Sequence, residues 1–381
     1  MAKIMIVVPY AKYYKNFSWD LIQSLALEGH EVIAAAPSNP YKDELQSIGV
    51  AFEAIPIKNT GLNPFYDLFS IYKMIKVFKK HQPDLFCFYS IKPILYGSIA
   101  AAFTKSRNVL LMVTGLGYTF SLGGQKRSIL FHVVKKLYTF AVDHCKQVLF
   151  ENPDDLRLFQ HQSILKHNRA LVVNGAGVNI DRFRMSIRPV QPFVFLVVAR
   201  VISDKGIEEY AEAARLLKVK YPHVVFQLLG PMDKNPTAIP ASKLKSWVEE
   251  GILQYLGETE DVRPFLKRAS VFVLPSYREG TPKSALEAMA MGLPIITADS
   301  PGCRETVVEA YNGFLVPVRN APALAAAMEK FIVEPRIIPR MGLKSRELAV
   351  KKYDVRIVNT SIKTAMGLVA EPIAKNEKVT G

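Results

Sequence analysis

The chain has 381 residues, 49% of them apolar and 22% charged, with a formal net charge of +15 at pH 7. This length favours two domains over one, and the apolar content suffices for two sizeable cores, which excludes a disordered chain. The three cysteines, Cys87, Cys145 and Cys303, lack the spacing of a metal site or a disulfide framework, which predicts a reducing compartment.

The chain opens on a short apolar run, residues 4–8, that ends at Pro9 and is typical of a first buried strand rather than a secretory signal. The longest uncharged stretch, residues 108–125, contains four glycines and several hydroxyl side chains, so it lacks the continuous apolar character of a spanning helix. We therefore expect a cytoplasmic protein without a transmembrane segment.

In the first half, short apolar runs alternate with amphipathic stretches. The runs predict strands at residues 4–8, 31–36, 52–57, 85–89, 109–114, 147–150 and 170–173. Such alternation is typical of a doubly wound α/β domain, in which helices cover a parallel sheet.

Residues 182–192 contain two prolines and few apolar anchors, which predicts a linker that acts as a hinge. The alternation then restarts, with strands expected at residues 193–199, 224–229, 253–256, 271–274, 295–297 and 314–316. We therefore expect two parallel-sheet domains, residues 1–185 and 186–353, and a C-terminal segment, residues 354–381.

Positive charge is concentrated between Lys58 and Lys146, where 13 Lys and Arg stand against three acidic residues. Two predicted amphipathic helices, 69–80 and 126–146, carry most of it, and such helices often lie on anionic lipid, where each cation contributes about 1 kcal/mol. A solvated helix face and a nucleic-acid groove are the alternatives. The expected membrane patch consists of Lys73, Lys76, Lys79, Lys80, Lys126, Arg127, Lys135 and Lys136.

Two glutamates, Glu279 and Glu287, flank a predicted strand-to-helix junction that follows the strand at 271–274. Pro282 suits the first turn of the helix, because its missing N–H breaks no hydrogen bond there. Gly280 and Thr281 would then offer free backbone N–H groups to a phosphate at the positive end of the helix dipole. Alone, the two glutamates could equally belong to a solvated helix face.

Two cations, Arg200 and Lys205, follow the predicted strand 193–199. In an open parallel sheet, ligands bind outside the C-terminal ends of the strands, so these cations and both glutamates could face one crevice. Because a charge-assisted contact contributes about 1.5–3 kcal/mol, two cations and a helix N-terminus suffice to hold a nucleotide diphosphate without a metal. Taken separately, the cations could be surface charges at a sheet edge.

At these residues the chain resembles family 4 of the retaining nucleotide-sugar glycosyltransferases, which have the GT-B architecture of two Rossmann-like domains facing a central cleft. Residues 175–179 and 288–294 carry the resemblance further. It implies that Glu279 contacts the transferred sugar, Glu287 the ribose hydroxyls, and Arg200 and Lys205 the diphosphate. It also implies a C-terminal helix, residues 353–369, that crosses back onto the first domain.

Within the family, the N-terminal half most resembles bacterial enzymes that add N-acetylhexosamines to undecaprenyl-diphosphate sugars, including those of protein N-glycosylation. The resemblance places the acceptor beside Asn16, Phe17, Thr114, Gly115, Gly117 and Tyr118. A tight turn beside a core tyrosine would also explain residues 114–118. Many family members carry a histidine where Thr114-Gly115 stands, so we expect no histidine-assisted step.

The predicted function is transfer of an N-acetylhexosamine from a UDP-sugar, with retention, to a polyprenyl-diphosphate-linked sugar at the inner face of the cell membrane. No cofactor or metal is expected, since the chain has no Asp-x-Asp sequence. The expected partners are the UDP-sugar, the lipid-linked saccharide and an anionic membrane surface, without nucleic acid or an obligate protein partner. Whether the sugar is N-acetylgalactosamine, N-acetylglucosamine or a plain hexose stays open.

Three other functions fit parts of the pattern. A GT-B epimerase or hydrolase would share the donor site and consume UDP-sugar without an acceptor. A transferase with a soluble acceptor would not need the basic patch. A noncatalytic peripheral membrane scaffold would keep the patch and bind no UDP.

Overall fold

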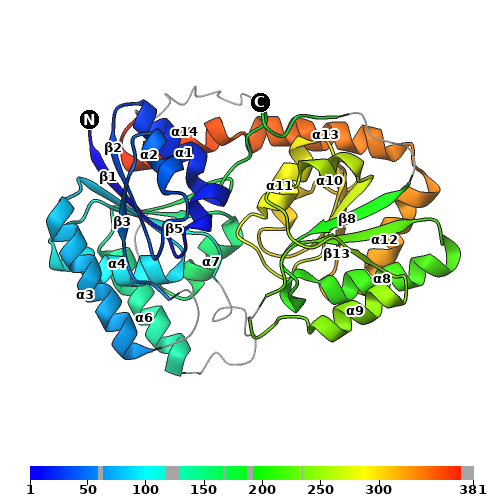
Figure 1. The fold of residues 1–381 in the computed structure, drawn as a ribbon, viewed down its shortest axis with the longest axis horizontal. Coiled ribbons are helices and arrows are strands. Elements are labelled where there is room, and N and C mark those ends of the chain that lie inside the picture. The colour runs from blue at the N-terminus through cyan, green and yellow to red at the C-terminus, as the bar shows by residue number, and fades with distance from the viewer. Residues whose placement is uncertain (59–62, 117–128, 166–168, 187–191, 234, 370–381) are drawn as a thin grey trace, which may run out of the picture.

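The computed structural model describes residues 1–58, 63–116, 129–165, 169–186, 192–233 and 235–369. Two α/β units lie side by side, and each contains one parallel sheet flanked by helices (Figure 1). Both units have hydrophobic core on the two faces of their sheet. This arrangement confirms the predicted GT-B fold class.

The first sheet has seven parallel strands in the order β3-β2-β1-β4-β5-β6-β7. Its central strands are buried on both faces, which explains why they read as unbroken apolar runs in the sequence. The strands are β1 (Lys3–Val7), β2 (Glu31–Ala36), β3 (Ala51–Ala54), β4 (Leu85–Tyr89), β5 (Val109–Val113), β6 (Gln147–Phe150) and β7 (Ala170–Val172).

The helices of the first unit are η1 (Tyr14–Ser18), α1 (Trp19–Leu27), α2 (Lys42–Ser47), α3 (Pro64–His81), α4 (Ile91–Phe103), α6 (Ile129–Asp143) and α7 (Pro153–His161). Asn-Pro pairs begin two of them. The Asn63 side chain accepts from the Tyr66 amide, and Asn152 accepts from the Asp155 amide, while the following proline occupies the first helical position. Helix α3 therefore begins five residues before the predicted start at residue 69.

The second sheet has six strands in the order β10-β9-β8-β11-β12-β13. They are β8 (Val194–Val198), β9 (Val225–Leu229), β10 (Gln254–Tyr255), β11 (Val271–Leu274), β12 (Ile295–Ala298) and β13 (Gly313–Val316). The helices are η2 (Ser203–Lys205), α8 (Ile207–Lys220), α9 (Ala241–Glu249), α10 (Arg263–Arg268), α11 (Lys283–Ala290), η3 (Arg304–Thr306), α12 (Ala321–Val333) and α13 (Ile337–Lys352). Every predicted strand of both sheets is present: β2, β4, β6 and β11 have the predicted bounds, and no end of the other strands is shifted by more than three residues.

The last helix, α14 (Val355–Met366), leaves the second unit and packs on the first. Its residues Val358, Ile362, Ala365 and Met366 belong to the same core cluster as Leu25 of α1. The predicted crossing helix is therefore present. The chain passes from the first sheet to the second between β7 and β8, a stretch that includes the predicted boundary at residue 185. Two residues of the predicted basic patch, Lys126 and Arg127, lie outside the described residues.

Arg346 of α13 connects the linker to α11. Its guanidinium donates to the carbonyls of Phe183 at 2.9 Å, Ala290 at 2.7 Å and Ile180 at 3.2 Å. Backbone carbonyls that lose such a donor inside a protein are costly to leave without a partner.

We predict that Arg346→Ala lowers the free energy of unfolding by about 3 kcal/mol, because three carbonyls lose a charged donor at once. Urea denaturation followed by circular dichroism measures the shift. Arg340→Ala, at an exposed position of the same helix, is the matched control and should change stability little. Equal stability of the two variants would contradict this account of the linker.

Candidate active site at the domain interface

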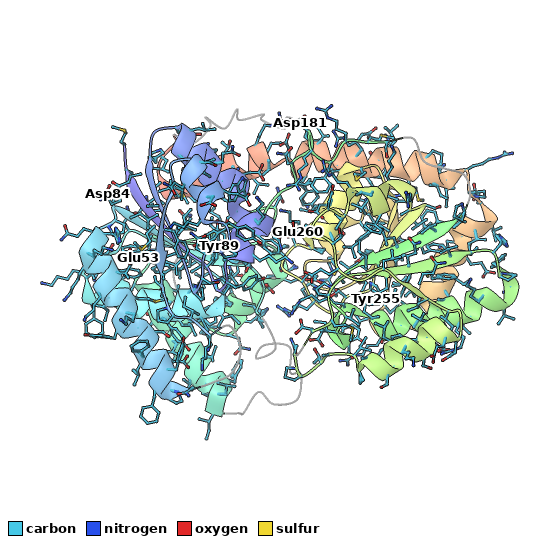
Figure 2. All side chains as sticks on the ribbon, viewed as in Figure 1. Glu53, Asp84, Tyr89, Asp181, Tyr255 and Glu260 are labelled. Carbon is cyan, nitrogen blue, oxygen red and sulfur yellow. The ribbon has the colours of Figure 1, made fainter. Side chains whose placement is uncertain are left out.

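The C-terminal ends of the strands of both sheets point toward the domain interface. Figure 2 shows Tyr89, the last residue of β4, and Glu260, in the loop after β10, on the sides of the two units that face each other. Parallel strands in one sheet bring all their carboxyl ends to the same edge, so loops from both sheets meet here. The predicted site residues fall in these loops.

Glu279 lies in the loop between β11 and α11 and forms an ion pair with Lys205, at the end of η2. Both side chains are about 15% exposed, and Lys205 Nζ donates to Glu279 Oε1. The Glu279 amide donates to the Pro301 carbonyl at 2.9 Å, which fixes the loop against the end of β12. Two residues 74 positions apart are thus brought together, as the strand-end argument predicts.

Arg200 follows β8 but does not join this ion pair. Its guanidinium is half-exposed and donates to the Asp233 carboxylate at 2.7 Å. Its positive charge also lowers the pKa of Tyr10, which burial raises above its usual value. Arg200 therefore faces the first unit near Tyr10, with a carboxylate partner that sequence reasoning did not identify.

Glu287 lies on α11, four residues after the helix begins at Lys283. Burial raises the pKa of its carboxyl group to about 7, although the nearby cations Lys283 and Arg182 act in the opposite direction. Lys283 also donates to the carbonyl of Asn16 and lies 5.7 Å from the centre of the Phe17 ring. The helix that carries the predicted ribose-binding glutamate thus contacts two predicted acceptor residues of η1.

The structure corrects the predicted phosphate cradle at Gly280, Thr281 and Pro282. The Thr281 amide donates to Glu151 Oε2 at 3.0 Å, so it is not free, because the first unit reaches across and occupies it. Pro282 precedes α11 as its N-cap instead of lying in its first turn. Within the described residues, the amides without a protein acceptor at this helix start are those of Gly280, Lys283 and Ser284.

The predicted acceptor residues after β5 lie against the same loop. Gly115 is so near that a Cβ atom on it would lie 3.5 Å from the Gly280 amide nitrogen. Thr114 Oγ1 lies 3.2 Å from Ser90 Oγ, at the end of the neighbouring strand β4. The structure therefore brings Thr114 and Gly115 to the loop that carries Glu279, whereas Gly117 and Tyr118 lie outside the described residues.

Sequence reasoning missed the segment after β6, residues 151–155. Asp155 forms an ion pair with Arg278, and Asp154 lies 2.5 Å from Arg304 of η3. The signal was present, because this acidic segment follows a predicted strand and must therefore lie at the same sheet edge as the other site residues.

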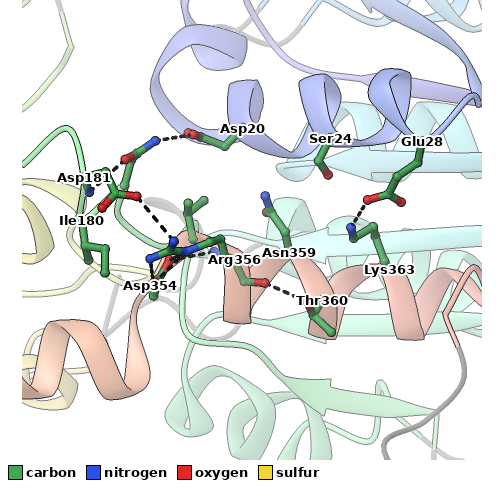
Figure 3. A pocket seen from close by; sticks show the side chains of 12 residues that line it. Asp20, Ser24, Glu28, Ile180, Asp181, Asp354, Arg356, Asn359, Thr360 and Lys363 are labelled. Atoms are coloured by element: carbon green, nitrogen blue, oxygen red, sulfur yellow. Dashed lines mark hydrogen bonds and ion pairs between the residues drawn. The ribbon is translucent and has the colours of Figure 1, made fainter.

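A groove of about 340 Å³ lies away from these residues, between α1, residues 179–181 and α14 (Figure 3). Its polar side chains bind each other: Asn179 donates to Asp20 at 2.9 Å, and Lys363 to Glu28 at 2.5 Å. The groove is a polar seam between the crossing helix and the first unit, and none of the predicted substrate residues lines it.

Over the described ranges, no group of three or more His, Cys, Asp or Glu side chains is arranged to hold a metal ion. In the same part of the chain, no helix combines the length and apolar character needed to cross a membrane.

Two family models match the chain, one to each unit. A model described as "Glycosyl transferase 4-like" matches residues 3–152, and one described as "Glycosyl transferases group 1" matches residues 192–334. The chain belongs to the family 4 glycosyltransferases with the GT-B architecture. The predicted family and its glycosyltransferase activity are therefore confirmed.

Relatives extend over almost the whole chain of this glycosyltransferase. It is 28% identical over 358 residues to the N,N'-diacetylbacillosaminyl-diphospho-undecaprenol alpha-1,3-N-acetylgalactosaminyltransferase of Campylobacter jejuni, covering 90% of this chain and 92% of the relative. It is 24% identical to the UDP-Gal:alpha-D-GlcNAc-diphosphoundecaprenol alpha-1,3-galactosyltransferase of Escherichia coli, covering 84% of each. Among solved structures, sucrose-phosphate synthase from Thermosynechococcus elongatus superposes with a TM-score of 0.79 at 18% identity, over 96% of this chain and 98% of that one.

We predict that UDP binding weakens as the pH falls through about 7. The predicted contact of the ribose hydroxyls with Glu287 is stronger for the ionised carboxylate than for the neutral acid, because charge-assisted hydrogen bonds are the stronger ones, and the raised pKa of that group sets the midpoint. Isothermal titration with UDP between pH 5.5 and 7.5 measures the effect. Glu287→Gln should bind UDP about tenfold more weakly at pH 7.5, and its UDP affinity should no longer fall as the pH is lowered through 7. An unchanged fall in the variant would assign the pH dependence to another group.

Proposed function

We propose that the protein transfers an N-acetylhexosamine from a UDP-sugar, with retention of configuration, to a saccharide linked to a polyprenyl diphosphate. The observation that carries the proposal is the Lys205 and Glu279 pair at the domain interface, because it sets a cation for a diphosphate beside a carboxylate for sugar hydroxyls. The acceptor class draws support from the two bacterial relatives, whose names both specify an undecaprenol-linked diphosphate sugar.

In the proposed reaction, the bond between the anomeric carbon and the diphosphate oxygen breaks while the acceptor hydroxyl oxygen bonds to the same face of that carbon. The acceptor proton passes to the departing phosphate oxygen, which becomes part of UDP. Lys205, Arg200 and the amides of Lys283 and Ser284 would stabilise the negative charge that grows on the diphosphate. We propose that these cations and amides do so without a metal ion.

We predict that Glu279→Ala lowers transfer at least about 100-fold, because the sugar loses a charged hydrogen-bond acceptor and Lys205 loses its partner. The assay is mass spectrometry of lipid products after incubation with a panel of UDP-sugars and a short polyprenyl-diphosphate-linked amino sugar. The wild type should give a product heavier by one N-acetylhexosamine. Glu347→Ala, on the exposed face of α13, is the matched control and should retain activity.

Two other results would redirect the proposal. Saturable UDP-sugar binding without a lipid product would keep the donor site and reject the acceptor. UDP-sugar consumption in the absence of acceptor would favour the epimerase or hydrolase alternative.

We also propose that α3 and α6 dock the enzyme on an anionic membrane surface, which would bring a lipid-linked acceptor to the first unit. Both helices pack against α4 and lie on one flank of that unit (Figure 1). On α3 an apolar stripe with helical spacing is exposed: Phe65, Leu68, Phe69 and Tyr72. On α6 the exposed apolar residues are Ile129, Leu130 and Val133.

The lysines of the predicted patch continue these stripes. Lys73 and Lys76 lie over the rings of Phe69 and Tyr72, at 5.4 and 4.7 Å. Lys79 and Lys136 are exposed, Lys80 pairs with Glu53, and Lys135 is half-buried. Sequence reasoning recognised the charge but not the apolar stripe, because the predicted helix began at Phe69 and so excluded Phe65 and Leu68.

We predict that replacing both Phe65 and Phe69 by serine reduces co-sedimentation with anionic vesicles about tenfold or more, since each buried aromatic contributes about 1.5–3 kcal/mol. Replacing Lys73 and Lys76 by glutamine should reduce binding to anionic vesicles and leave neutral ones unaffected. Val219→Ser, at an exposed position of α8 in the second unit, is the control. Equal wild-type binding to neutral and anionic vesicles would remove the electrostatic part of the proposal.

A further inference from the structure

Glu151 is a buried carboxyl group that reaches from one unit to the other. It follows the last residue of β6, is 7% exposed, and accepts from the Thr281 amide of the opposite unit at 3.0 Å. The Thr281 hydroxyl in turn donates to the Glu151 carbonyl at 2.8 Å. A Cβ atom on Gly280 would lie 2.1 Å from Glu151 Oε2, so a side chain at this position would displace the carboxyl group.

The neighbours of Glu151 hold the same loop. The Asn152 side-chain amide donates to the carbonyls of Gly280 at 2.8 Å and Glu279 at 3.3 Å. Asp155 pairs with Arg278 on the other flank of Glu279. The segment 151–155 therefore clamps the sugar-binding loop, residues 278–281, on both sides of its glutamate.

The charged groups around Glu151 are mostly anionic. Asp155 of α7 and Glu279 of the clamped loop both raise the pKa of its carboxyl group. The cations beside them already have carboxylate partners, because Arg278 pairs with Asp155 and Lys205 with Glu279. From the remaining elements, the buried hydroxyls of Tyr13 and Tyr89 face it, and Glu151 raises the pKa of both.

Burial is the largest cause of the shift in Glu151, and it raises the pKa to about 8 even though the Thr281 amide favours the ionised form. A donor diphosphate bound by Lys205 and the start of α11 would add negative charge to the same loop. A carboxylate at this position would then repel the ligand, whereas a neutral carboxyl group keeps its hydrogen bond, since its carbonyl oxygen still accepts from Thr281.

We propose that Glu151 is a positioning residue that takes up a proton when a nucleoside diphosphate binds, so that the sugar-binding loop stays clamped to the first unit beside an anionic donor. The inference rests on the proposed function, because it takes the donor to be a nucleoside diphosphate. The clamp aligns Glu279 with Thr114 and Gly115, and protonation of Glu151 makes the clamp compatible with the diphosphate.

The test is isothermal titration of the full chain with UDP in two buffers of different ionisation enthalpy, between pH 6.5 and 9. Little uptake by Glu151 is expected at pH 6.5, where it is already protonated. Uptake should rise above pH 8 toward one proton per UDP, and UDP affinity should fall by up to about tenfold per pH unit there. UDP itself titrates little above about pH 7.5, where the uptake is expected, because its terminal phosphate has a pKa of about 6.

Glu151→Gln separates a titrating role from a structural one. The glutamine oxygen can still accept from the Thr281 amide, so the clamp is retained while the proton is lost. We expect no uptake in this variant and a UDP affinity that is flat above pH 8. Glu287 is distinguished by its sign, because binding to ribose makes it release a proton around pH 7, and this release is retained in Glu151→Gln.

Glu258→Gln is the matched control. Glu258 is a half-exposed carboxylate that also joins the two units, through Lys12 at 2.5 Å, and its loss should leave the uptake unchanged. UDP binding without proton uptake in the wild type would overturn the proposal, and that measurement needs no variant. Equal uptake in Glu151→Gln and wild type would overturn it too. Failure of UDP to bind at any pH would instead reject the donor assignment, and with it this inference.

Discussion

The contact between the loop after β11 and the loop after β6 is the constraint on which the active site depends. In the proposed function, donor groups come from the second sheet and acceptor groups from the first, so neither sheet would form the site alone. The Asn152 amide and the Glu151 carboxyl group hold Gly280 and Thr281 from the opposite unit. Because these are hydrogen bonds to backbone atoms, they set the position of the loop independently of its side chains.

The electrostatics of the interface follow from this contact. Two carboxyl groups, Glu151 and Glu287, have raised pKa values because burial penalises their ionised forms. Their roles differ, since Glu287 lies beside Lys283 and is suited to accept from ribose as a carboxylate. Glu151 is surrounded by other acids and is suited to remain neutral. The same physical effect, burial, is thus the basis of two predicted pH dependences of opposite sign.

The units are joined a second time on the side of the molecule where α14 crosses. Val178 exchanges backbone hydrogen bonds with Tyr353 at 2.7 Å and Val355 at 3.0 Å, and α14 buries its apolar face in the first core. Gly175 packs so tightly on Thr281 that a Cβ atom there would lie 2.7 Å from the threonine Cβ. The segment that precedes the predicted linker therefore contacts the clamped loop at Gly175 and the start of α14 at Val178.

The sequence by itself determined both sheets, because parallel strands buried on two faces read as unbroken apolar runs separated by amphipathic helices. It also determined that Glu279 and Lys205 meet, since parallel strands end at a common edge. Only the tertiary structure decided that Arg200 turns to Asp233, that Thr281 is already hydrogen-bonded, and that Glu151 belongs to the site. Local spacing describes one strand and one helix at a time, whereas these contacts depend on how two separately folded sheets face each other. The apolar stripe on α3 was missed for a local reason, because the Asn63 cap that begins the helix was not recognised. That this stripe is exposed could be known only from the tertiary structure, in which the opposite face of α3 packs on α4.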